Sequence, residues 1–416
     1  MEGLSQAEQK RHVLIQLSRY SGNPLYAKLE LGTWTEFFSL ISEWIKTGVH
    51  TLYFEEVQWL AGYDSQFISE LKYAWDNEFR HNSDLIMILC GSSPSFMINE
   101  VLHSKALYNR SQHEMPLQEF SLSETAQMLS RRSPREVLDA YLLVGGIPEY
   151  LKRLQSKSSV FLSLCEESFR KGGFFSHEYE RIFTSSLAGN KNYKKIIAFL
   201  SLRKFASRSE IARHLKIGSG GTLTGLLDDL EVCQFITKYA PYNLGSDSLL
   251  TRYCLRDAYL RFYFKFIAPI EHQIDQGDFD TNPSSAIKTD TLNKWLGFSF
   301  ERFCCQHNRL IAKILGFHGV RYRSGAYFSR TAEKSQPNFQ FDLVFERDDK
   351  VVTVCEIKYL QSKVSTSVVT EFERKLALFL LSKTRTLHKV LIAPEGADSA
   401  VLRRGYFDQV ITLNDL

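Results

Sequence analysis

Two short apolar runs and the amphipathic stretch between them organise the beginning of the chain. The first run ends in the paired carboxylates of Glu55 and Glu56, and the second, Asp84–Cys90, is followed closely by Ser92. Between the two runs, apolar residues recur at helical spacing over Phe67–Phe79. This order predicts a βαβ unit of a parallel sheet, in which both strand ends meet at one edge. Ligands bind at that edge in α/β proteins.

The polar residues at this predicted edge suit nucleotide chemistry. Glu55 and Glu56 are placed to hold a magnesium ion, directly or through a water, or to activate an attacking water. A hydroxyl at Ser92, beside the carboxylates, is what a site that senses a γ-phosphate uses. The structural alternative is a strand end followed by a solvated turn, with Ser92 as a helix cap.

Three helical stretches followed by two alternating runs predict a winged helix-turn-helix in the middle of the chain. The runs Phe235–Tyr239 and Arg252–Leu255 are the expected wing strands. The third helix, Thr222–Leu230, carries Asp228 and Asp229 and no arginine, which argues against base reading in a major groove. DNA contact and a domain-packing or protein-contact role both stay open. The basic residues available to phosphate are Lys194, Lys195, Arg203, Lys204, Arg208, Arg213 and Lys216.

The carboxyl-terminal region combines a long helical pattern with two β-prone runs. Trp295–Leu315 predicts one helix, and this helix carries Glu301. The runs Phe339–Arg347 and Val351–Tyr359 are joined by a short polar turn and predict a β-hairpin. Further short strands after residue 389 complete the pattern of an α/β/α layer domain.

Asp342, Glu356 and Lys358 are the charged residues embedded in the apolar surroundings of this hairpin. Glu356 and Lys358 are two residues apart, so both point to the same face of the strand. A divalent metal held by Asp342 and Glu356 would offset the desolvation of the acids, leaving Lys358 to stabilise an attacking water or developing charge. A helix over Val369–Leu381, which includes Lys375, is expected over the same site. The structural alternative is an Asp–Lys–Glu ion network beneath a helix.

Several short stretches together resemble the archaeal-type ATPase family of the AAA+/STAND superfamily. The resemblance covers nearly the whole chain from Trp34 onward. In Leu107-Tyr108-Asn109-Arg110, Asn109 replaces the glycine of the family. Met115-Pro116-Leu117, with Phe120-Ser121, resembles the short strand and turn that follow. Leu143–Leu151 matches the Gly-Gly-x-Pro-x-Tyr-Leu signature of the family.

This resemblance implies roles for the residues at the predicted sheet edge. Glu55 and Glu56 stand at the Walker B positions, where Glu55 departs from the usual aspartate. Ser92 corresponds to the sensor residue, and Arg110 is a candidate arginine contact to phosphate. The family also carries a restriction-endonuclease-like domain at its carboxyl end.

The phosphate-binding loop of that family, G-x-x-x-x-G-K-[ST], does not occur in this sequence. The family carries it before the segment corresponding to Leu4, where it supplies the N–H cradle and the lysine that hold the phosphates. Gly218–Thr222, the glycine cluster of the chain, lacks the lysine and a preceding strand. Either the true start lies upstream of Met1, or the loop lies on another chain, or ATP is not hydrolysed. Without the loop we expect ATP to bind weakly at best.

The D…ExK layout of Asp342, Glu356 and Lys358, with Glu301 on the preceding helix, resembles the restriction-endonuclease-like nuclease superfamily. The resemblance implies metal-dependent phosphodiester cleavage by these four residues. Asp342 and Glu356 would be the ligands of Mg²⁺. Two functions therefore stay open: an ATPase-family protein with degenerate or absent ATP hydrolysis, or a magnesium-dependent nuclease in which the ATPase-like domain is a scaffold.

Composition sets the remaining limits. A chain of 416 residues is too long for one core, and its net charge of +4 permits contact with nucleic acid without requiring it. Its seven cysteines form no CxxC pair, which indicates buried thiols rather than a zinc site or a disulfide framework. No signal-peptide core or twenty-residue apolar run is present, so we expect a cytoplasmic protein without a membrane partner. A nucleic acid, a protein partner or a second copy of the chain are the expected partners.

The expected fold class is multidomain α/β. It consists of a truncated P-loop-type parallel α/β domain, a helical lid, a winged helix-turn-helix, a linker and an α/β/α restriction-endonuclease-like domain. In the same order, their expected bounds are 1–125, 126–190, 191–267, 268–293 and 294–416.

Overall fold

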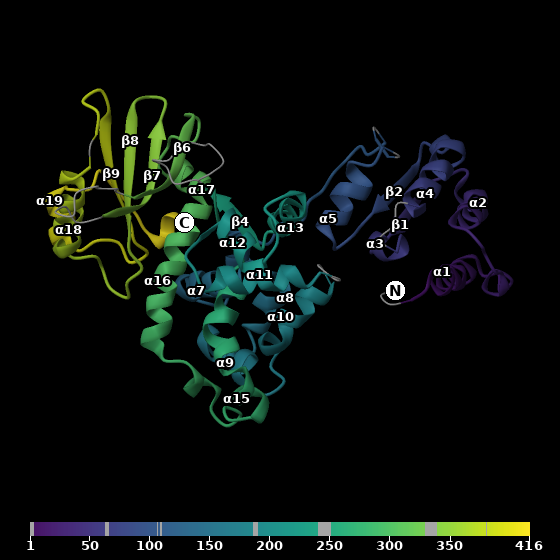
Figure 1. Cartoon of the computed structure of the whole chain (residues 1–416), viewed down its shortest axis with the longest axis horizontal. Coiled ribbons are helices and arrows are strands. Elements are labelled where there is room, and N and C mark those ends of the chain that lie inside the picture. Colours follow the sequence, from purple (N-terminus) through teal and green to yellow (C-terminus); the bar gives the residue numbers. More distant parts are fainter. Residues whose placement is uncertain are drawn as a thin grey trace. The chain divides into compact units, whose positions relative to one another are not determined.

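The structure is a computed structural model of the whole chain (Figure 1). It describes residues 4–62, 66–105, 107–108, 110–185, 190–239, 251–328, 339–379 and 381–416. Asn109 and the loop between the two expected wing strands lie outside the described residues. The chain forms two units, of which the first comprises Met1–Leu117, Ile182–Asn190 and Asp228–Cys233, and the second Gln118–Arg181, Lys191–Leu227 and Gln234–Leu416.

Two parallel strands form the sheet of the first unit. β1 (His50–Phe54) pairs with β2 (Leu85–Leu89), and His50 lies opposite Leu85. The parallel pair predicted from the apolar runs is therefore confirmed. The α-helices that precede, separate and follow these two strands along the chain are α1 (Gln6–Ser21), α2 (Trp34–Ile45), α3 (Val57–Leu60), α4 (Gln66–Asn77) and α5 (Pro94–Phe96).

The core of the first unit is an aromatic cluster around Phe38, which is fully buried on α2. Its ring meets Phe54 at the end of β1, Phe67 on α4 and Phe79 after α4, with ring centroids 5.7–6.1 Å apart and edge-to-face geometry. These contacts hold α2 and α4 against the strand that ends at the paired acids. Edge-to-face packing is a favoured arrangement of aromatic rings.

The strand expected at Met115-Pro116-Leu117 is not formed. Residues 111–120 have no regular secondary structure, and Met115 and Leu117 are 82% and 85% exposed. Proline lacks the N–H that a strand ladder requires, and exposed side chains contribute no packing that would fix an extended segment. Regular structure resumes at α6 (Leu122–Met128), which Ser121 caps.

The Gly145-Gly146-Ile147-Pro148 segment forms a close backbone contact in the second unit. It joins α7 (Pro134–Val144) to α8 (Pro148–Arg153), and Phe120 N donates to the Gly146 carbonyl at 2.9 Å. A Cβ atom at Gly146 would lie 2.0 Å from the Phe120 carbonyl oxygen, so only glycine fits. Glu119 accepts a hydrogen bond from Gly146 N at 2.9 Å.

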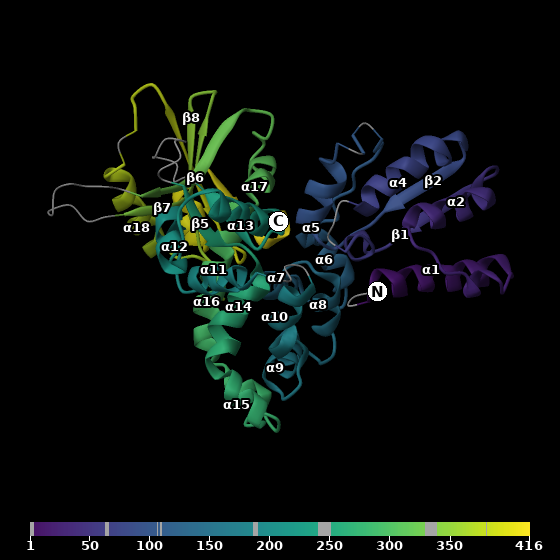
Figure 2. The ribbon, with the colours of Figure 1, turned by 45° about the vertical axis from the view of Figure 1, so that its right-hand side comes forward.

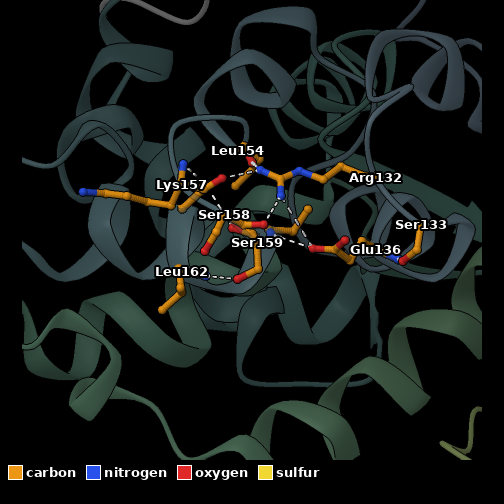
Figure 3. A network of polar contacts seen from close by, with 10 residues as sticks. Arg132, Ser133, Glu136, Leu154, Lys157, Ser158, Ser159 and Leu162 are labelled. Carbon is orange, nitrogen blue, oxygen red and sulfur yellow. Dashed lines mark hydrogen bonds and ion pairs between the residues drawn. The ribbon is translucent and has the colours of Figure 1, made fainter.

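A polar network fixes the start of α7 against the loop before α9 (Val160–Phe169), as Figure 3 shows. The Arg132 guanidinium donates to the carbonyls of Lys157, at 2.6 Å, and Ser158. Glu136 on α7 accepts from Val160 N at 3.0 Å. Ser159 caps α9 by accepting from Leu162 N at 3.2 Å. α10 (Phe174–Ser185) follows α9.

The middle of the chain combines three helices with a three-stranded antiparallel sheet. The strand order is β3-β5-β4, and Ser207 caps the second helix. The helix and strand types agree with the expected pattern. The bounds are α11 (Lys191–Ser201), β3 (Ala206–Ser207), α12 (Arg208–Leu215), α13 (Gly221–Val232), β4 (Ile236–Tyr239) and β5 (Arg252–Leu255).

The segment 268–293 is largely helical. After α14 (Ala258–Phe262) it contains α15 (Glu271–Gln276) and the start of α16 (Thr289–Gln306), and the side chains of Ile274 and Ile287 are buried. Figure 2 lets the reader follow the chain from α14 through α15 into α16.

The prediction of a single helix over Trp295–Leu315 is wrong. The first helix, α16, ends at Gln306, and α17 (Asn308–Ile314) begins after His307. The His307 ring stacks on Phe303 at 4.3 Å, with Nδ1 3.0 Å from the Phe303 carbonyl oxygen. Asn308 Nδ2 donates to the Cys305 carbonyl at 3.1 Å. Side chains thus take up carbonyls at the helix end, and this local competition ends α16.

A five-stranded mixed sheet forms the centre of the carboxyl-terminal region, in the order β10-β9-β8-β7-β6. β7 pairs antiparallel with both β6 and β8, which confirms the predicted hairpin, whereas β8, β9 and β10 run parallel. Figure 1 shows α18 and α19 on one side of this sheet and α16 and α17 on the other. The bounds are β6 (Tyr322–Phe328), β7 (Gln340–Arg347), β8 (Val351–Ile357), α18 (Thr366–Ala377), β9 (Thr386–Ile392), α19 (Ser399–Arg404) and β10 (Gln409–Ile411).

None of the helices in the described part of the chain combines the length and the apolar character needed to cross a membrane.

Replacing Phe38 by alanine should destabilise the first unit by about 3–5 kcal/mol, because a fully buried ring is lost and a cavity remains. Urea unfolding followed by tryptophan fluorescence measures this change, since Trp34 stacks on Phe38. The matched control is Tyr73→Ala on α4, where the side chain is 56% exposed and the loss should stay below about 0.5 kcal/mol. Equal losses in the two variants would contradict the proposed core.

Candidate functional site

The acids and lysines expected at a common site come together at the open end of the β7–β8 hairpin, away from its turn. Leu343 pairs with Cys355 in the antiparallel register, so Asp342 and Glu356 are the next residues along the two strands. Glu356 and Lys358 extend to the same side, as the spacing of two predicted, and Lys358 Nζ lies 2.8 Å from Glu356 Oε1.

Glu356 is the central residue of this site. Its side chain has no exposed surface, although it lies at the end of a strand. The ammonium of Lys375, on α18, donates to both carboxylate oxygens at 3.1 Å. Two cations from different elements therefore meet one buried carboxylate, which offsets its desolvation. The expectation that the α18 region lies over the site is confirmed for Lys375.

Two further carboxyls are influenced by this cluster. Burial raises the pKa of Asp342 to about 7, and the nearby Glu301 and Glu356 carboxylates add to the rise. Burial also raises the pKa of Glu301 on α16, and the Lys204 ammonium gives the largest opposing influence. Burial acts to lower the pKa of Lys358, but Glu356 and other nearby acids together raise it above its ordinary value. Three carboxyls thus share one electrostatic environment.

Gln340 and Lys204 belong to the same cluster, although the sequence did not place them there. Gln340 Nε2 donates to Asp342 Oδ1 at 3.2 Å, and Lys204 Nζ donates to Gln340 Oε1 at 3.3 Å. Gln340 is two residues before Asp342, and this alternation could have pointed to it. Lys204 lies 136 positions away from Gln340 in the chain, and no local pattern indicates their contact.

The oxygen donors of Asp342, Glu356 and Glu301 are of the kind that Mg²⁺ prefers. Among the described residues, no group of three or more histidine, cysteine, aspartate or glutamate side chains is arranged to hold a metal ion. The ammonium of Lys375 already contacts both carboxylate oxygens of Glu356. A divalent cation would have to compete with that ammonium for the carboxylate.

The carboxyl edge of the two-stranded sheet in the first unit forms a second polar cluster. Ser92 Oγ donates to Glu56 Oε2 at 2.6 Å, which confirms that the two strand ends are neighbours. Gln58, a fully buried residue of α3, donates to Ser92 Oγ at 3.0 Å and also to Glu56. Glu56 itself has a left-handed backbone conformation (φ 53°), which is uncommon for a residue other than glycine.

Arg110 binds a residue outside this edge cluster. Its guanidinium binds Asp76 on α4 through two hydrogen bonds of 2.9 and 2.8 Å. Among the described residues, Glu55 forms no hydrogen bond or ion pair with Arg110 or Ser92. The structure therefore joins Glu56 with Ser92 and pairs Arg110 with a carboxylate that the sequence did not single out.

Two of the basic residues of the middle region form contacts within the fold. Arg208 donates to the carbonyls of Ser219 and Gly220 and to Thr224 Oγ1, which fixes the turn before α13. Lys194 forms an ion pair with Glu180 at 2.6 Å. These two residues are committed to internal contacts in the described structure.

No protein-family model matches this chain. A curated relative, the uncharacterized protein MJECL04 of Methanocaldococcus jannaschii, is 28% identical over 222 residues. The match covers 53% of this chain and 49% of the relative. The chain thus spans about half the length of the curated relative that it matches.

Two solved structures show partial similarity. The Walker-type ATPase PABY2304 of Pyrococcus abyssi aligns over 62% of this chain and 79% of its own, with 18% identity and a TM-score of 0.43. The ORC2 protein of Aeropyrum pernix, solved as ADPNP–ADP complexes, aligns over 65% of this chain and 76% of its own, with 11% identity and a TM-score of 0.40. Both TM-scores are below 0.5, so these likenesses do not establish a shared fold.

The raised pKa of Asp342 gives the acidic site a pH dependence. Because the folded-state pKa is about 7 and the ordinary value is 3.8, the folded protein binds more protons than the unfolded chain between about pH 4 and 7. The contribution of this carboxyl to stability is therefore present at low pH and is lost as pH rises through 7. In EDTA, the free energy of unfolding of Asp342→Asn should fall less from pH 5 to pH 8 than that of the parent.

Urea titrations at several pH values measure this difference. The matched control is Asp349→Asn in the turn between β7 and β8, where the carboxylate is exposed and pairs with Arg347. An identical pH slope in the parent and Asp342→Asn would show that Asp342 titrates normally.

Proposed function

We propose that the carboxyl-terminal region is a restriction-endonuclease-like domain that hydrolyses phosphodiester bonds with the help of a divalent metal ion. The observation that carries this proposal is the convergence of Asp342, Glu301, Glu356 and Lys358 at the open end of the β7–β8 hairpin. Two acids beside a lysine at a strand end are suited to phosphate chemistry, because the acids can hold a cation and the lysine can stabilise negative charge.

Each residue has a distinct role in the proposed reaction. Asp342 and Glu356 would hold Mg²⁺, which supplies polarisation of the phosphate and of the attacking water. Glu301, whose pKa is raised by burial, would accept a proton from that water. Lys358 would stabilise the charge that develops on the phosphate oxygens. In this proposal the water attacks phosphorus as Glu301 takes its proton, the bond to the leaving oxygen breaks, and that oxygen takes a proton from solvent water.

The remaining regions are proposed to support this site. The β1–β2 unit, with the expected helical lid, is an ATPase-like scaffold related to the archaeal-type ATPase family. The helices α11–α13 with β3–β5 are a winged helix that contacts nucleic acid or a partner. The order of elements and the match of Leu143–Leu151 to the signature of that family support both assignments.

Metal-dependent cleavage should depend on the acid cluster. With Mg²⁺ or Mn²⁺, Glu356→Gln and Asp342→Asn should each cleave DNA or RNA at least about 100-fold more slowly than the parent, because a metal ligand is lost. Mn²⁺ should raise the melting temperature of the parent and not that of Glu356→Gln. Gel assays of labelled oligonucleotides and thermal unfolding measure the two effects.

The matched control is Glu346→Gln on the same strand as Asp342. Glu346 pairs with Arg385 and lies four residues, about 13 Å, along β7 from Asp342. Cleavage that persists in both acid variants would rule out this site. An absence of cleavage together with an absence of Mn²⁺ stabilisation in the parent would favour a structural ion network of Glu356 with its two lysines.

A second function is favoured by the polar edge cluster of the first unit. The contact of Ser92 Oγ with Glu56, 2.6 Å long, lies where a parallel sheet binds ligands. A nucleotide–magnesium complex bound there would act as a switch, with Glu56 as the acid and Ser92 as the phosphate sensor.

Titration with a labelled ATP analogue and Mg²⁺ tests this switch. The parent should bind with saturation in the micromolar range or weaker, and Glu56→Gln should lose most of that binding because the metal contact is weakened. Glu70→Gln on α4, which accepts from Thr35 in the same unit, is the control and should bind as the parent does. An absence of saturable binding in the parent contradicts the switch.

A further inference from the structure

The turn between α11 and β3 carries an exposed lysine beside the acidic site. Lys204 Nζ donates to Gln340 Oε1 at 3.3 Å and lies 5.8 Å from the centre of the Phe328 ring at the end of β6. Through Gln340 the contact continues to Asp342 Oδ1 at 3.2 Å. A residue of the middle region thus reaches the first strand of the acidic site.

This position of the turn is fixed by several contacts. Arg302, the residue after Glu301 on α16, donates to the Lys204 carbonyl at 3.2 Å and to the Leu255 carbonyl at 2.9 Å. Phe205, the next residue along the turn, meets the Phe328 ring edge-to-face at 6.4 Å. The backbone on both sides of Lys204 is therefore held to the carboxyl-terminal region, whereas its side chain is exposed.

Lys204 differs from the other two lysines at the site: its charge acts to lower the pKa of Glu301, but it forms no ion pair among the described residues. Lys358 and Lys375 both form ion pairs with Glu356. In the described part of the chain, no carboxylate lies within ion-pair distance of Lys204, and its polar side-chain partner is the neutral amide of Gln340. An exposed ammonium that is not neutralised by an ion pair attracts an anion from solution.

We propose that Lys204 is a substrate-binding residue of the acidic site, which holds a phosphate of a nucleic-acid strand next to the phosphate that is cleaved. This inference rests on the proposed hydrolysis of phosphodiesters. The strand then runs from the turn after α11 across Gln340 to Asp342, so that the middle and carboxyl-terminal regions bind it together. Lys204 is the point at which the two regions share the ligand.

The chemistry of the Lys204 side chain determines which feature of a nucleic acid it can recognise. An ammonium recognises phosphate without regard to the base, so Lys204 contributes affinity and placement but no sequence preference. The Lys204 ammonium lies 5.8 Å from the centre of the Phe328 ring, and the rings of Phe205 and Phe328 pack edge-to-face. Lys204 is assigned to a single-stranded segment or a strand end, in which the phosphate beside Lys204 and the scissile phosphate can both approach the buried acids.

Oligonucleotide binding tests the role of Lys204. With the full-length protein, fluorescence anisotropy in EDTA measures the affinity for single-stranded DNA, single-stranded RNA and duplex DNA over a range of salt concentrations. Lys204→Gln should bind single strands several-fold more weakly than the parent. The slope of log affinity against log salt should decrease by about 0.7, as expected for one lost phosphate contact.

Two variants complete the experiment. Lys204→Arg should restore affinity and slope, because the positive charge is retained. Lys288→Ala removes an exposed lysine at the start of α16, about 20 Å along the helix from Glu301, and should change neither quantity.

An unchanged affinity in Lys204→Gln, an equal loss in Lys288→Ala, or an absence of oligonucleotide binding by the parent would each overturn the proposal. A preference for duplex DNA would overturn the assignment to a single strand. Because EDTA prevents metal-dependent cleavage, this outcome is separate from that of the acid variants. If Lys204→Gln weakens binding while Glu356→Gln leaves cleavage unchanged, the binding role stands and the hydrolytic site fails.

Discussion

The carboxyl-terminal site depends on the compensation of one buried charge. Glu356 has no exposed surface, and an ionised carboxylate in such a position costs several kcal/mol unless cations and hydrogen bonds meet it. Lys358 comes from the same strand and Lys375 from α18, so strand and helix are both tied to the carboxylate. A shift of β8 by one residue would turn Glu356 and Lys358 to the opposite face and separate them from α18.

The same constraint explains why the site consists of groups from so many elements. Asp342 lies on β7, Glu301 on α16 and Lys204 before β3, and each influences the protonation of another. Close carboxyls in a buried environment cannot all ionise without nearby positive charge. The cations that the fold supplies are therefore part of the site, and a residue's role there depends on its place in the fold as much as on its type.

The sequence predicted what local periodicity controls. The apolar spacing over Phe67–Phe79 predicted the helix α4, the β1–β2 pair and the β7–β8 hairpin were correct, and the two-residue alternation placed Glu356 and Lys358 on one face. The break at His307 was missed, because it depends on side chains that compete for carbonyls within an otherwise regular pattern.

The sequence pattern did not indicate which residues far apart in the chain would form contacts. The pairing of Arg110 with Asp76 and the approach of Lys204 to Gln340 join residues that only the folded chain brings together. The family resemblance suggested a phosphate contact for Arg110, but it gave no indication of the carboxylate that Arg110 binds in this fold.

Glu301 and Arg302 are adjacent on α16, and their side chains leave the helix about 100° apart. Arg302 is anchored to two backbone carbonyls, those of Leu255 and Lys204. Any rotation of α16 about its long axis would break both anchors at the same time as it withdrew Glu301 from the acids. The contacts of Arg302 thus fix the rotation of α16 about its axis, and this rotation determines the position of Glu301.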